Sequence, residues 1–301
     1  MSKISITKVH TFLGHNDSLY TLERVDETQF LSAGGDGMVV LWDLKSPDEG
    51  EVIAKVQGSI YAICFDAEND VLYVGQNNEG IHKIDFSSKK EVGSVNLGNH
   101  QIFDIKLFDG NIWVGLQSGE IVILNEQLEV ASRKKFSPER VRNIEQSSNE
   151  LAIAFSDNTT RIMDYRDGSI VHELIGHKNS VFAAKYHPSG KYLASVSRDA
   201  HIKIWDTSEQ YVLRESIAAH LYSINDLVFH KDGKYFVSAS MDKSIKLWDA
   251  YNFKLLKVLD KHRHAGHGNS VNKLLWMDYQ DLLVSCSDDR SISIWKIDFE
   301  E

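Results

Sequence analysis

One short pattern recurs seven times along the chain, and its spacing limits the folds that the chain can adopt. The clearest copies are FLSAGGDGMVVLWD, YLASVSRDAHIKIWD, YFVSASMDKSIKLWD and LLVSCSDDRSISIWK, and weaker copies end at positions 85, 125 and 164. The last positions of the seven copies are 43, 85, 125, 164, 206, 249 and 296, so that successive copies lie 42, 40, 39, 42, 43 and 47 residues apart. Such a period indicates seven structural units of similar size.

The residue pattern inside each unit predicts β-structure. Runs such as HIKIW, SIKLW and SISIW alternate apolar and polar side chains and are bounded by turn residues. No stretch of 12 or more residues has helical periodicity. Regularly spaced strands suit a sandwich, a barrel or a propeller, but four strands every 40–45 residues favour the propeller. We therefore predict an all-β, seven-bladed propeller of four-stranded antiparallel blades, with residues 1–301 as a single domain.

Composition narrows the class of protein further. The chain has 301 residues, 42% of them hydrophobic, a formal net charge of −10 and two cysteines. These values are ordinary for a globular protein, and no apolar run reaches the length of a membrane span or of a secretory signal. The acidic balance disfavours broad binding to nucleic acid or to anionic membranes. Two distant cysteines make no disulfide framework, and we therefore expect a cytoplasmic protein.

The repeat resembles the WD-repeat β-propeller family. Four units carry a Gly-His or Ala-His pair, then a turn Asp, then a Trp followed by Asp or Lys. These are Gly14-His15 to Asp36 to Trp42-Asp43, Gly176-His177 to Asp199 to Trp205-Asp206, Ala219-His220 to Asp242 to Trp248-Asp249, and Gly266-His267 to Asp289 to Trp295-Lys296. Four copies in phase and three degenerate ones make the resemblance specific, and it covers essentially the whole chain.

The resemblance implies a buried hydrogen-bond network of His, Ser, Asp and Trp in each complete unit. The four sets are His15, Ser32, Asp36 and Trp42; His177, Ser195, Asp199 and Trp205; His220, Ser238, Asp242 and Trp248; His267, Ser285, Asp289 and Trp295. Ser, His and Asp also occur together in nucleophilic enzymes. Because an enzyme needs one active site and this set occurs four times in phase, we interpret the sets as structural.

Units two to four depart from the pattern in a consistent way. Ile84, Leu124 and Met163 stand where the other units have Trp, and Val74, Val114 and Ile153 stand at the Ser position. The turn Asp is replaced by Asn78 and Ser118 and is kept as Asp157. Since both partners of the polar pair change together, these units are predicted to use apolar packing instead.

The two ends of the chain are predicted to meet. VHTFLGH, at positions 9–15, resembles VHELIGH, at positions 171–177, where the run before Gly-His is an outer strand. The last unit reaches only its third strand, ISIWKI, near the end of the sequence. We therefore expect Ile4 to Phe12, within a closing segment of residues 1–12, to supply the missing fourth strand. The closed ring would hide edges that promote aggregation.

The resemblance also implies a binding face around the central channel. Its contact positions lie three and five residues after the His and just before the turn Asp. The residues predicted to contact a partner are Tyr20, Tyr61, Phe103, Arg140, Arg142, Phe182, Arg198 and Met241. Aromatic residues and Arg are enriched in binding hot spots. Alternatively, the aromatic residues pack between blades; the three arginines are expected to be exposed, because unpaired Arg is rarely buried.

A second cluster lies in the longest spacer, where KHRHAGHG places His262, His264 and His267 within six residues. Three such histidines suit a metal site, but His267 already belongs to a structural set, so we interpret the segment as a solvated insertion loop without metal.

We expect a non-enzymatic scaffold without cofactor, a monomer that joins a larger complex through a protein or peptide partner, with no membrane or nucleic-acid ligand. One alternative is a propeller enzyme of the hydrolase or lyase type with a site at the central channel, for which the sequence offers Asp104 and the histidines of the long spacer but no convincing constellation. The other is a nucleic-acid platform that uses the arginines and aromatic residues.

Overall fold

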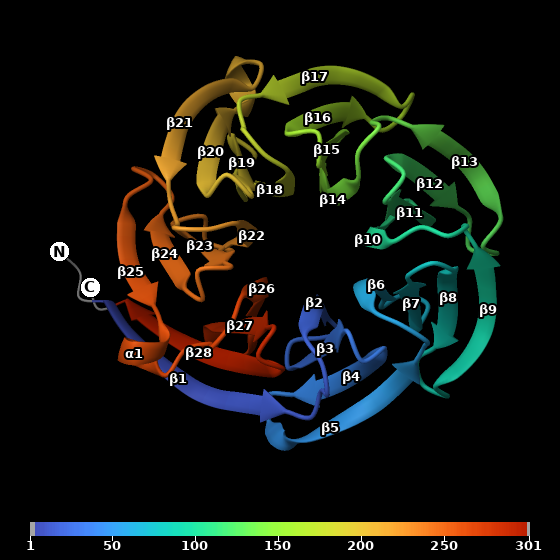
Figure 1. The fold of residues 1–301 in the computed structure, drawn as a ribbon, viewed down its shortest axis with the longest axis horizontal. Helices are drawn as coiled ribbons and strands as arrows, with labels where there is room; N and C mark the ends of the chain where they lie inside the picture. The colour runs from blue at the N-terminus through green and yellow to red at the C-terminus, as the bar shows by residue number, and fades with distance from the viewer. Residues whose placement is uncertain (1–3, 300–301) are drawn as a thin grey trace.

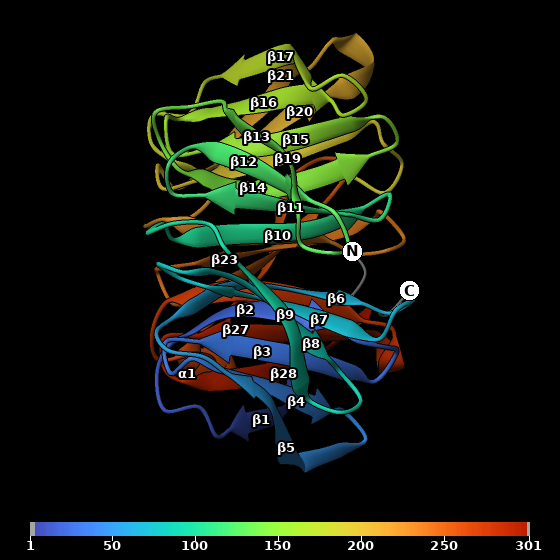
Figure 2. The ribbon, with the colours of Figure 1, turned by 90° about the vertical axis from the view of Figure 1, so that its right-hand side faces the viewer.

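The computed structural model describes residues 4–299, and these form seven four-stranded antiparallel sheets arranged as blades around a central axis (Figure 1). Blade 1 comprises β2 to β5, and blades 2 to 6 each take the next four strands in order. Blade 7 combines β26, β27 and β28 with β1. Seen from the side, the blades lie next to one another in a disc (Figure 2). The predicted fold class is confirmed.

The strands of each blade run from the channel to the periphery. The innermost strands are β2 (Leu19–Arg24), β6 (Ile60–Asp66), β10 (Ile102–Phe108), β14 (Val141–Ser147), β18 (Val181–Tyr186), β22 (Ile224–Phe229) and β26 (Val271–Met277). The second strands are β3 (Gln29–Gly34), β7 (Val71–Gln76), β11 (Asn111–Leu116), β15 (Glu150–Phe155), β19 (Tyr192–Ser197), β23 (Tyr235–Ser240) and β27 (Leu282–Ser287).

The two outer layers complete each blade. The third strands are β4 (Met38–Asp43), β8 (Gly80–Asp85), β12 (Glu120–Leu124), β16 (Thr159–Asp164), β20 (His201–Asp206), β24 (Ile245–Asp249) and β28 (Ser291–Phe299). The outermost strands are β5 (Ser46–Lys55), β9 (Lys90–Asn96), β13 (Val130–Lys135), β17 (Ser169–Ile175), β21 (Val212–Ala218), β25 (Leu255–Leu259) and β1 (Ile4–Leu13).

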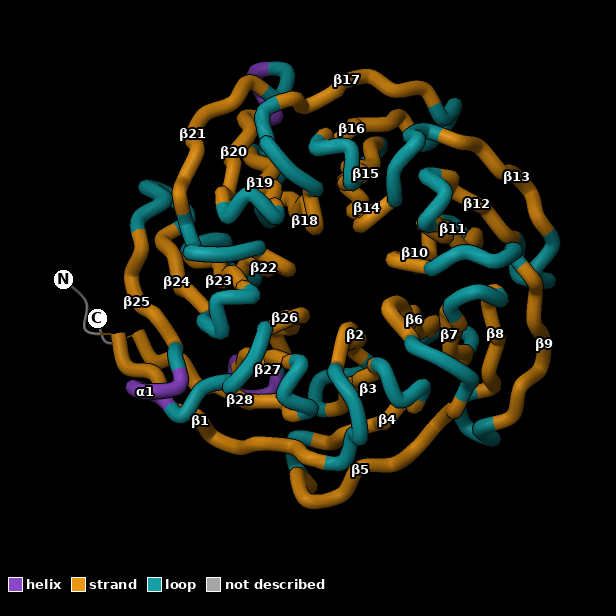
Figure 3. The backbone as a smooth tube through the Cα atoms, viewed as in Figure 1, coloured by secondary structure: helices purple, strands orange, loops and turns teal. Residues whose placement is uncertain are grey.

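Helical structure is confined to three short segments of the described chain (Figure 3): η1 (Thr207–Glu209), α1 (Lys261–His264) and η2 (Tyr279–Asp281). Within residues 4–299, no helix has the length and apolar character needed to cross a bilayer.

The ring closes by pairing the first strand with the last. β1 runs antiparallel to β28 from the pair Ile4 and Phe299 to the pair Leu13 and Ser291. The predicted closing strand is therefore confirmed for its described part, and residues 1–3 lie outside the described residues. Phe12 anchors the strand because its ring is only 2% exposed and packs between blades 7 and 1.

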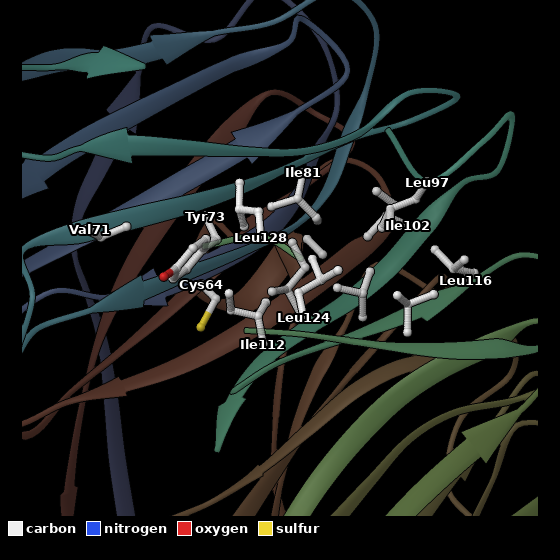
Figure 4. Close-up of a cluster of buried hydrophobic side chains, with 14 residues drawn as sticks. Cys64, Val71, Tyr73, Ile81, Leu97, Ile102, Ile112, Leu116, Leu124 and Leu128 are labelled. Carbon is white, nitrogen blue, oxygen red and sulfur yellow. The ribbon is translucent and has the colours of Figure 1, made fainter. Parts of the chain in front are cut away.

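The hydrophobic core consists of seven clusters, each between two neighbouring blades. The cluster between blades 2 and 3 joins Tyr73 and Ile81 to Ile112 and Leu124 (Figure 4). In blades 2 to 4, the apolar residues at the Trp and Ser positions lie in these clusters; Val74, Val114 and Ile153 are 0% exposed. Apolar packing thus replaces the polar network in these three blades, and all seven blades keep a continuous core around the ring.

Candidate functional site

The loops that surround one end of the channel are fixed by the repeated His, Ser, Asp and Trp residues. In blade 1, His15 Nδ1 lies 2.9 Å from an Asp36 carboxylate oxygen, and His15 Nε2 lies 2.8 Å from Ser32 Oγ. Trp42 Nε1 donates to the same Ser32 oxygen at 2.8 Å. The corresponding distances in blades 5, 6 and 7 are between 2.8 and 3.1 Å. All four predicted sets are thus assembled as hydrogen-bonded networks.

Electrostatics favour an ionised Asp beside a neutral His in the networks of blades 5 and 6. Burial lowers the pKa of His15, His177 and His220 despite the nearby carboxylates. Burial also opposes ionisation of Asp199, but hydrogen bonds from His177 and from backbone amides hold the pKa of Asp199 well below its usual range. A neutral His whose Nδ1–H donates to Asp leaves Nε2 to accept from Ser, whose oxygen accepts from Trp. Each network is therefore satisfied internally and offers no free nucleophile.

We term this end of the ring the upper face. It carries the loops that lead into the innermost strands and the turns between the second and third strands. Backbone hydrogen bonds join the two kinds of segment, as from Arg198 N to Ser180 O and from Met241 N to Ser223 O, both at 2.9 Å. These bonds fix the loops and turns of the upper face, so side chains at equivalent positions of different blades lie in equivalent places around the channel.

A β-bulge places one residue of each blade at the mouth of the channel. The register between the first and second strands shifts near the start of every innermost strand, as between Leu19 and Thr21 in blade 1. A bulge adds an unpaired residue and re-aims its side chain. The seven irregularities contain Tyr20, Tyr61, Phe103, Arg142, Phe182, Asn225 and Asn272, and the one in blade 2 also contains Ala62. The first seven are the positions five residues after the His in the repeat.

Five of these seven side chains form a continuous ladder around the channel mouth. Tyr20 meets Tyr61 edge-on, with 4.8 Å between ring centroids, and Tyr61 stacks on Phe103 at 5.6 Å. The Arg142 guanidinium carbon lies 4.4 Å from the centroid of Phe103 and 4.3 Å from that of Phe182. Stacking and cation–π contacts each contribute about 0.5–2 kcal/mol. The aromatic rings therefore contact neighbouring blades and also line the channel mouth.

Arg142 differs from its predicted environment. Arg140 and Arg198 are exposed, as expected, but Arg142 is half-buried between two rings. Burial and the positive charges of Arg140 and Arg198 lower the pKa of Arg142 to about 10, so it remains cationic at neutral pH. The expectation of full exposure was wrong for Arg142 because the ring faces of Phe103 and Phe182 stabilise its charge without a carboxylate partner.

The ladder borders a cavity of about 370 Å³ at the upper end of the channel. Six of the eight residues predicted to contact a partner line this cavity: Tyr20, Tyr61, Phe103, Arg140, Arg142 and Phe182. Arg198 and Met241 do not line it. Both lie outside it, exposed on the turns of blades 5 and 6.

The opposite side of the mouth is built from amides. Asn225 Nδ2 donates to Asn272 Oδ1 at 3.2 Å, and Asn272 Nδ2 donates to the carbonyl oxygen of Leu19 and to Asp288, both at 2.7 Å. These bonds tie blades 6, 7 and 1 together. The mouth is consequently asymmetric, with aromatic rings and guanidinium groups on blades 1 to 5 and neutral amides on blades 6 and 7.

The acids of the channel are engaged in contacts between blades, which the sequence analysis did not predict. Asp104, one position after the bulge of blade 3, accepts from Ile144 N at 2.7 Å and from Asn143 Nδ2 at 2.8 Å. Asn143 and Asp226 also follow the bulge residue of their blades. Asn143 Oδ1 accepts from Ala184 N at 3.0 Å, and Asp226 accepts from Leu274 N at 3.0 Å. Alignment of the positions that follow the bulges would have revealed these polar residues. The hydrogen bonds give Asp104 a structural role between blades 3 and 4.

The three histidines of the long spacer do not converge. His262 and His264 lie on the short helix α1, which Asp260 caps by accepting from Arg263 N at 2.8 Å. His267 instead uses both ring nitrogens within blade 7, toward Asp289 and Ser285. Among the residues that the structure describes, no group of three or more His, Cys, Asp or Glu side chains is arranged to hold a metal ion.

Comparison with known proteins gives a family for this architecture. The family model described as WD domain, G-beta repeat matches residues 6–43, 168–206, 211–249 and 254–296. The longest unmatched stretch, residues 44–167, contains β5 of blade 1, blades 2 and 3 and most of blade 4. In blades 2 to 4 the Trp and Ser positions are apolar.

The chain is also similar to parts of longer proteins. It is 33% identical over 214 residues to Nuclear distribution protein nudF of Aspergillus niger, which covers 70% of this chain and 44% of that protein. It is 27% identical over 222 residues to Striatin-3 of Homo sapiens, which covers 72% of this chain and 24% of that protein. The chain thus spans less than half the length of these curated relatives. The WD40 beta propeller domain of Doa1 has the same fold, with a TM-score of 0.84 at 18% identity over 97% of both chains.

Proposed function

The chain belongs to the WD40 family of G-beta repeats, and from this premise we propose that it is a non-enzymatic scaffold that binds a peptide segment of a partner protein at the mouth of its channel. The observation that carries the proposal is the asymmetric mouth, where Phe103, Arg142 and Phe182 form a half-buried stack beside a cavity of about 370 Å³. Binding pockets combine apolar walls with a few oriented polar groups, and this stack supplies both.

Two observations support a binding role over a catalytic one. The carboxylates nearest the cavity, those of Asp104 and Asp226, accept hydrogen bonds from backbone amides of the next blade. The Ser, His and Asp groups of the repeats are consumed in networks that occur four times. A general base needs access to a substrate proton, but Asp104 is engaged by amide groups of blade 4, and Asp226 is buried with its second carboxylate oxygen 3.6 Å from Lys273 Nζ.

The remaining parts of the proposal concern the whole protein. We propose that the ring is a single folding domain, that the protein is a monomer which joins a larger complex, and that it works in the cytoplasm. The location is supported by Cys64 and Cys286, which are both buried and unpaired. Disulfides are rare in reducing compartments, and buried free thiols suit such a compartment.

The proposal is tested by affinity capture from cell extract with three immobilised proteins. These are the wild type, the double variant Arg142→Ala, Phe182→Ala, and a control double variant Arg214→Ala, Val212→Ala. The control removes one guanidinium and one apolar side chain from the outer strand β21, where Val212 is 56% exposed. Thermal melts of all three proteins establish that they fold.

We expect some partners to bind the wild type and the control equally well. Recovery of these partners by the channel variant should fall at least about tenfold, because each hot-spot side chain contributes about 2 kcal/mol or more to binding. Equal recovery of all partners by the three proteins would place the interaction on another surface and refute the proposal.

A further inference from the structure

The upper face of blade 6 carries an exposed apolar patch that is missing from blades 1, 5 and 7, the other blades with a full network of His, Ser, Asp and Trp. Leu221 is 83% exposed, Tyr222 is 61% exposed and Met241 is 56% exposed. Ser240 Oγ donates to the carbonyl oxygen of Tyr222 at 3.3 Å, and Met241 N donates to Ser223 O at 2.9 Å, so the loop and the turn lie against each other. Soluble proteins rarely expose large apolar side chains close together, and an exposed apolar patch of this kind often marks an interaction site.

Comparison of the repeats shows that this patch is not required by the fold. The two residues after the network His are polar or Gly in the other complete blades: Asn16-Asp17 in blade 1, Lys178-Asn179 in blade 5 and Gly268-Asn269 in blade 7. In blades 1, 5 and 7 the backbone N–H of the first residue after the His donates to the turn Asp, and blade 6 keeps this bond, with Leu221 N donating to Asp242 at 3.1 Å. The network therefore accepts a polar residue at this position equally well.

Three guanidinium groups lie on the upper face of blades 4 and 5, the two blades that precede blade 6 in the ring. Arg140 and Arg142 lie at the mouth, and Arg198 occupies in blade 5 the turn position that Met241 occupies in blade 6. Among residues 4–299, no carboxylate lies within 4.0 Å of these guanidinium groups, and the pKa of Arg142 is lowered by burial and by the charges of Arg140 and Arg198. Three cations without carboxylate partners therefore lie on neighbouring blades of a protein whose net charge is −10, where they are available to bind an anionic group.

Acidic groups occupy the opposite side of the same face. Asp17 is exposed on the blade 1 loop, and Asp288, in the blade 7 turn, is partly exposed and accepts from Asn272 Nδ2 at 2.7 Å. Arg140, Arg142 and Arg198 thus lie on blades 4 and 5, and Asp17 and Asp288 lie on blades 1 and 7, which Figure 1 shows on different sides of the ring. Glu139 beside Arg140 and Arg290 beside Asp289 are also exposed and carry the opposite charges. A long uniformly anionic polymer would also meet the carboxylates, whereas a short acidic segment would avoid them.

We propose that the partner segment bound by this face is an acidic peptide with large apolar side chains next to its acidic residues. Its carboxylates pair with Arg140, Arg142 and Arg198, and its apolar side chains cover Leu221, Tyr222 and Met241. This inference rests on the proposed function and adds the chemistry of the partner and its path across blades 4, 5 and 6. Arg suits this role because its planar donors match a carboxylate in bidentate geometry.

The experiment is selection of a random dodecapeptide display library on the immobilised full chain. We expect selected peptides to be enriched in Asp or Glu adjacent to Leu, Ile, Met, Phe or Trp. Enrichment in Lys or Arg, or no enrichment over the starting library, would overturn the proposal. A fluorescently labelled selected peptide then gives dissociation constants by anisotropy.

Variants separate the two halves of the surface. Arg140→Glu with Arg198→Glu should weaken the selected peptide at least about tenfold and abolish the acidic preference in a repeated selection. Leu221→Ser with Met241→Ser should remove the apolar preference and keep the acidic one. A control, Arg214→Glu on the outer strand, should change neither. If both variants bind the peptide as the wild type does, the proposal fails.

Two further outcomes distinguish binding of an acidic peptide from binding of nucleic acid and from binding of another kind of peptide at the channel mouth. Single-stranded RNA is tested as a labelled 20-mer at low salt, about 50 mM, where phosphate contacts are strongest. Binding that the charge-reversal variant abolishes would assign the arginines to nucleic acid and overturn the peptide. If captured partners depend on Arg142 and Phe182 but not on Arg198, Leu221 or Met241, the proposed function stands and the present inference fails.

Discussion

Replacement of Phe12 by Ala tests whether the closing strand holds the whole ring together. The Phe12 ring is 2% exposed and lies 5.7 Å from the ring of Phe30 and 5.1 Å from that of Trp42, measured between centroids. Removal of a buried Phe side chain costs about 3–5 kcal/mol, through lost burial and the cavity that remains. The variant should therefore lose that much free energy of unfolding.

The size of the effect on the melting temperature follows from the chain length. At about 2.1 cal/mol/K per residue, a chain of 301 residues has an unfolding entropy of about 0.6 kcal/mol/K. A loss of 3–5 kcal/mol then lowers the Tm by about 5–8 °C if the ring unfolds as one unit. The matched control is Val9→Thr on the same strand, where Val9 is 51% exposed, and it should change the Tm by less than about 1 °C.

The measurement combines calorimetry with hydrogen exchange. Calorimetry of Phe12→Ala should show one transition at the lower temperature. Exchange followed by mass spectrometry should show faster opening in blade 4, on the far side of the ring, as well as in blades 7 and 1. The reasoning is refuted by a Tm within about 1 °C of the wild type. It is also refuted by a separate early transition that leaves exchange in blade 4 unchanged.

Three other predictions concern the buried polar and sulfur groups. Ser195→Ala leaves Trp205 Nε1 and a ring nitrogen of His177 without their partner, so urea unfolding should show a loss of about 1–3 kcal/mol for each stranded group; an unchanged midpoint would contradict it. The pKa of buried His177 lies below that of an unfolded His, and the pKa of Asp199 lies below that of an unfolded Asp. The unfolded chain therefore binds more protons in acid, and the free energy of unfolding should be flat between about pH 7 and pH 8, fall below about pH 6.5 and fall again below about pH 4; a rise on acidification would reverse the expected sign. Burial raises the pKa of the Cys64 thiol to about 12 and that of Cys286 above its usual range, so iodoacetamide at pH 8 should label neither thiol in the native protein and both in denaturant, as measured by intact mass.

The seven blades and their closure could be predicted because both depend on local pattern. Alternation and turn residues identify strands, and an outer-strand sequence before the first Gly-His shows that one blade must be completed from the other end. The positions of the residues at the channel mouth could also be predicted, since a fixed offset from the His marks one equivalent position in each blade. What the offset does not reveal is the bulge that turns Phe103 and Arg142 toward the channel, because a bulge is defined by pairing with the next strand.

The environment of Arg142 and the role of Asp104 depend on neighbours that are distant in sequence. Arg142 is stabilised by rings on both adjacent blades, and Asp104 accepts from an amide 40 positions away. Such contacts cross from one blade to the next, so a unit read by itself gives no sign of them. The sequence analysis singled out Met241 of the apolar patch but not Leu221 or Tyr222, although these two stand where the repeats of blades 1, 5 and 7 have polar residues or Gly.

Pairing of the first strand with the last also has a consequence for how the protein is made. β1 leaves the ribosome first, but its partner β28 begins only at Ser291. At roughly 5–20 residues per second, synthesis of the intervening chain takes about 14–56 s. Throughout that interval the nascent chain carries an unpaired strand edge and, in Phe12, an aromatic anchor without a site. Protection of this edge by a chaperone that acts during translation would therefore raise the yield of the closed ring.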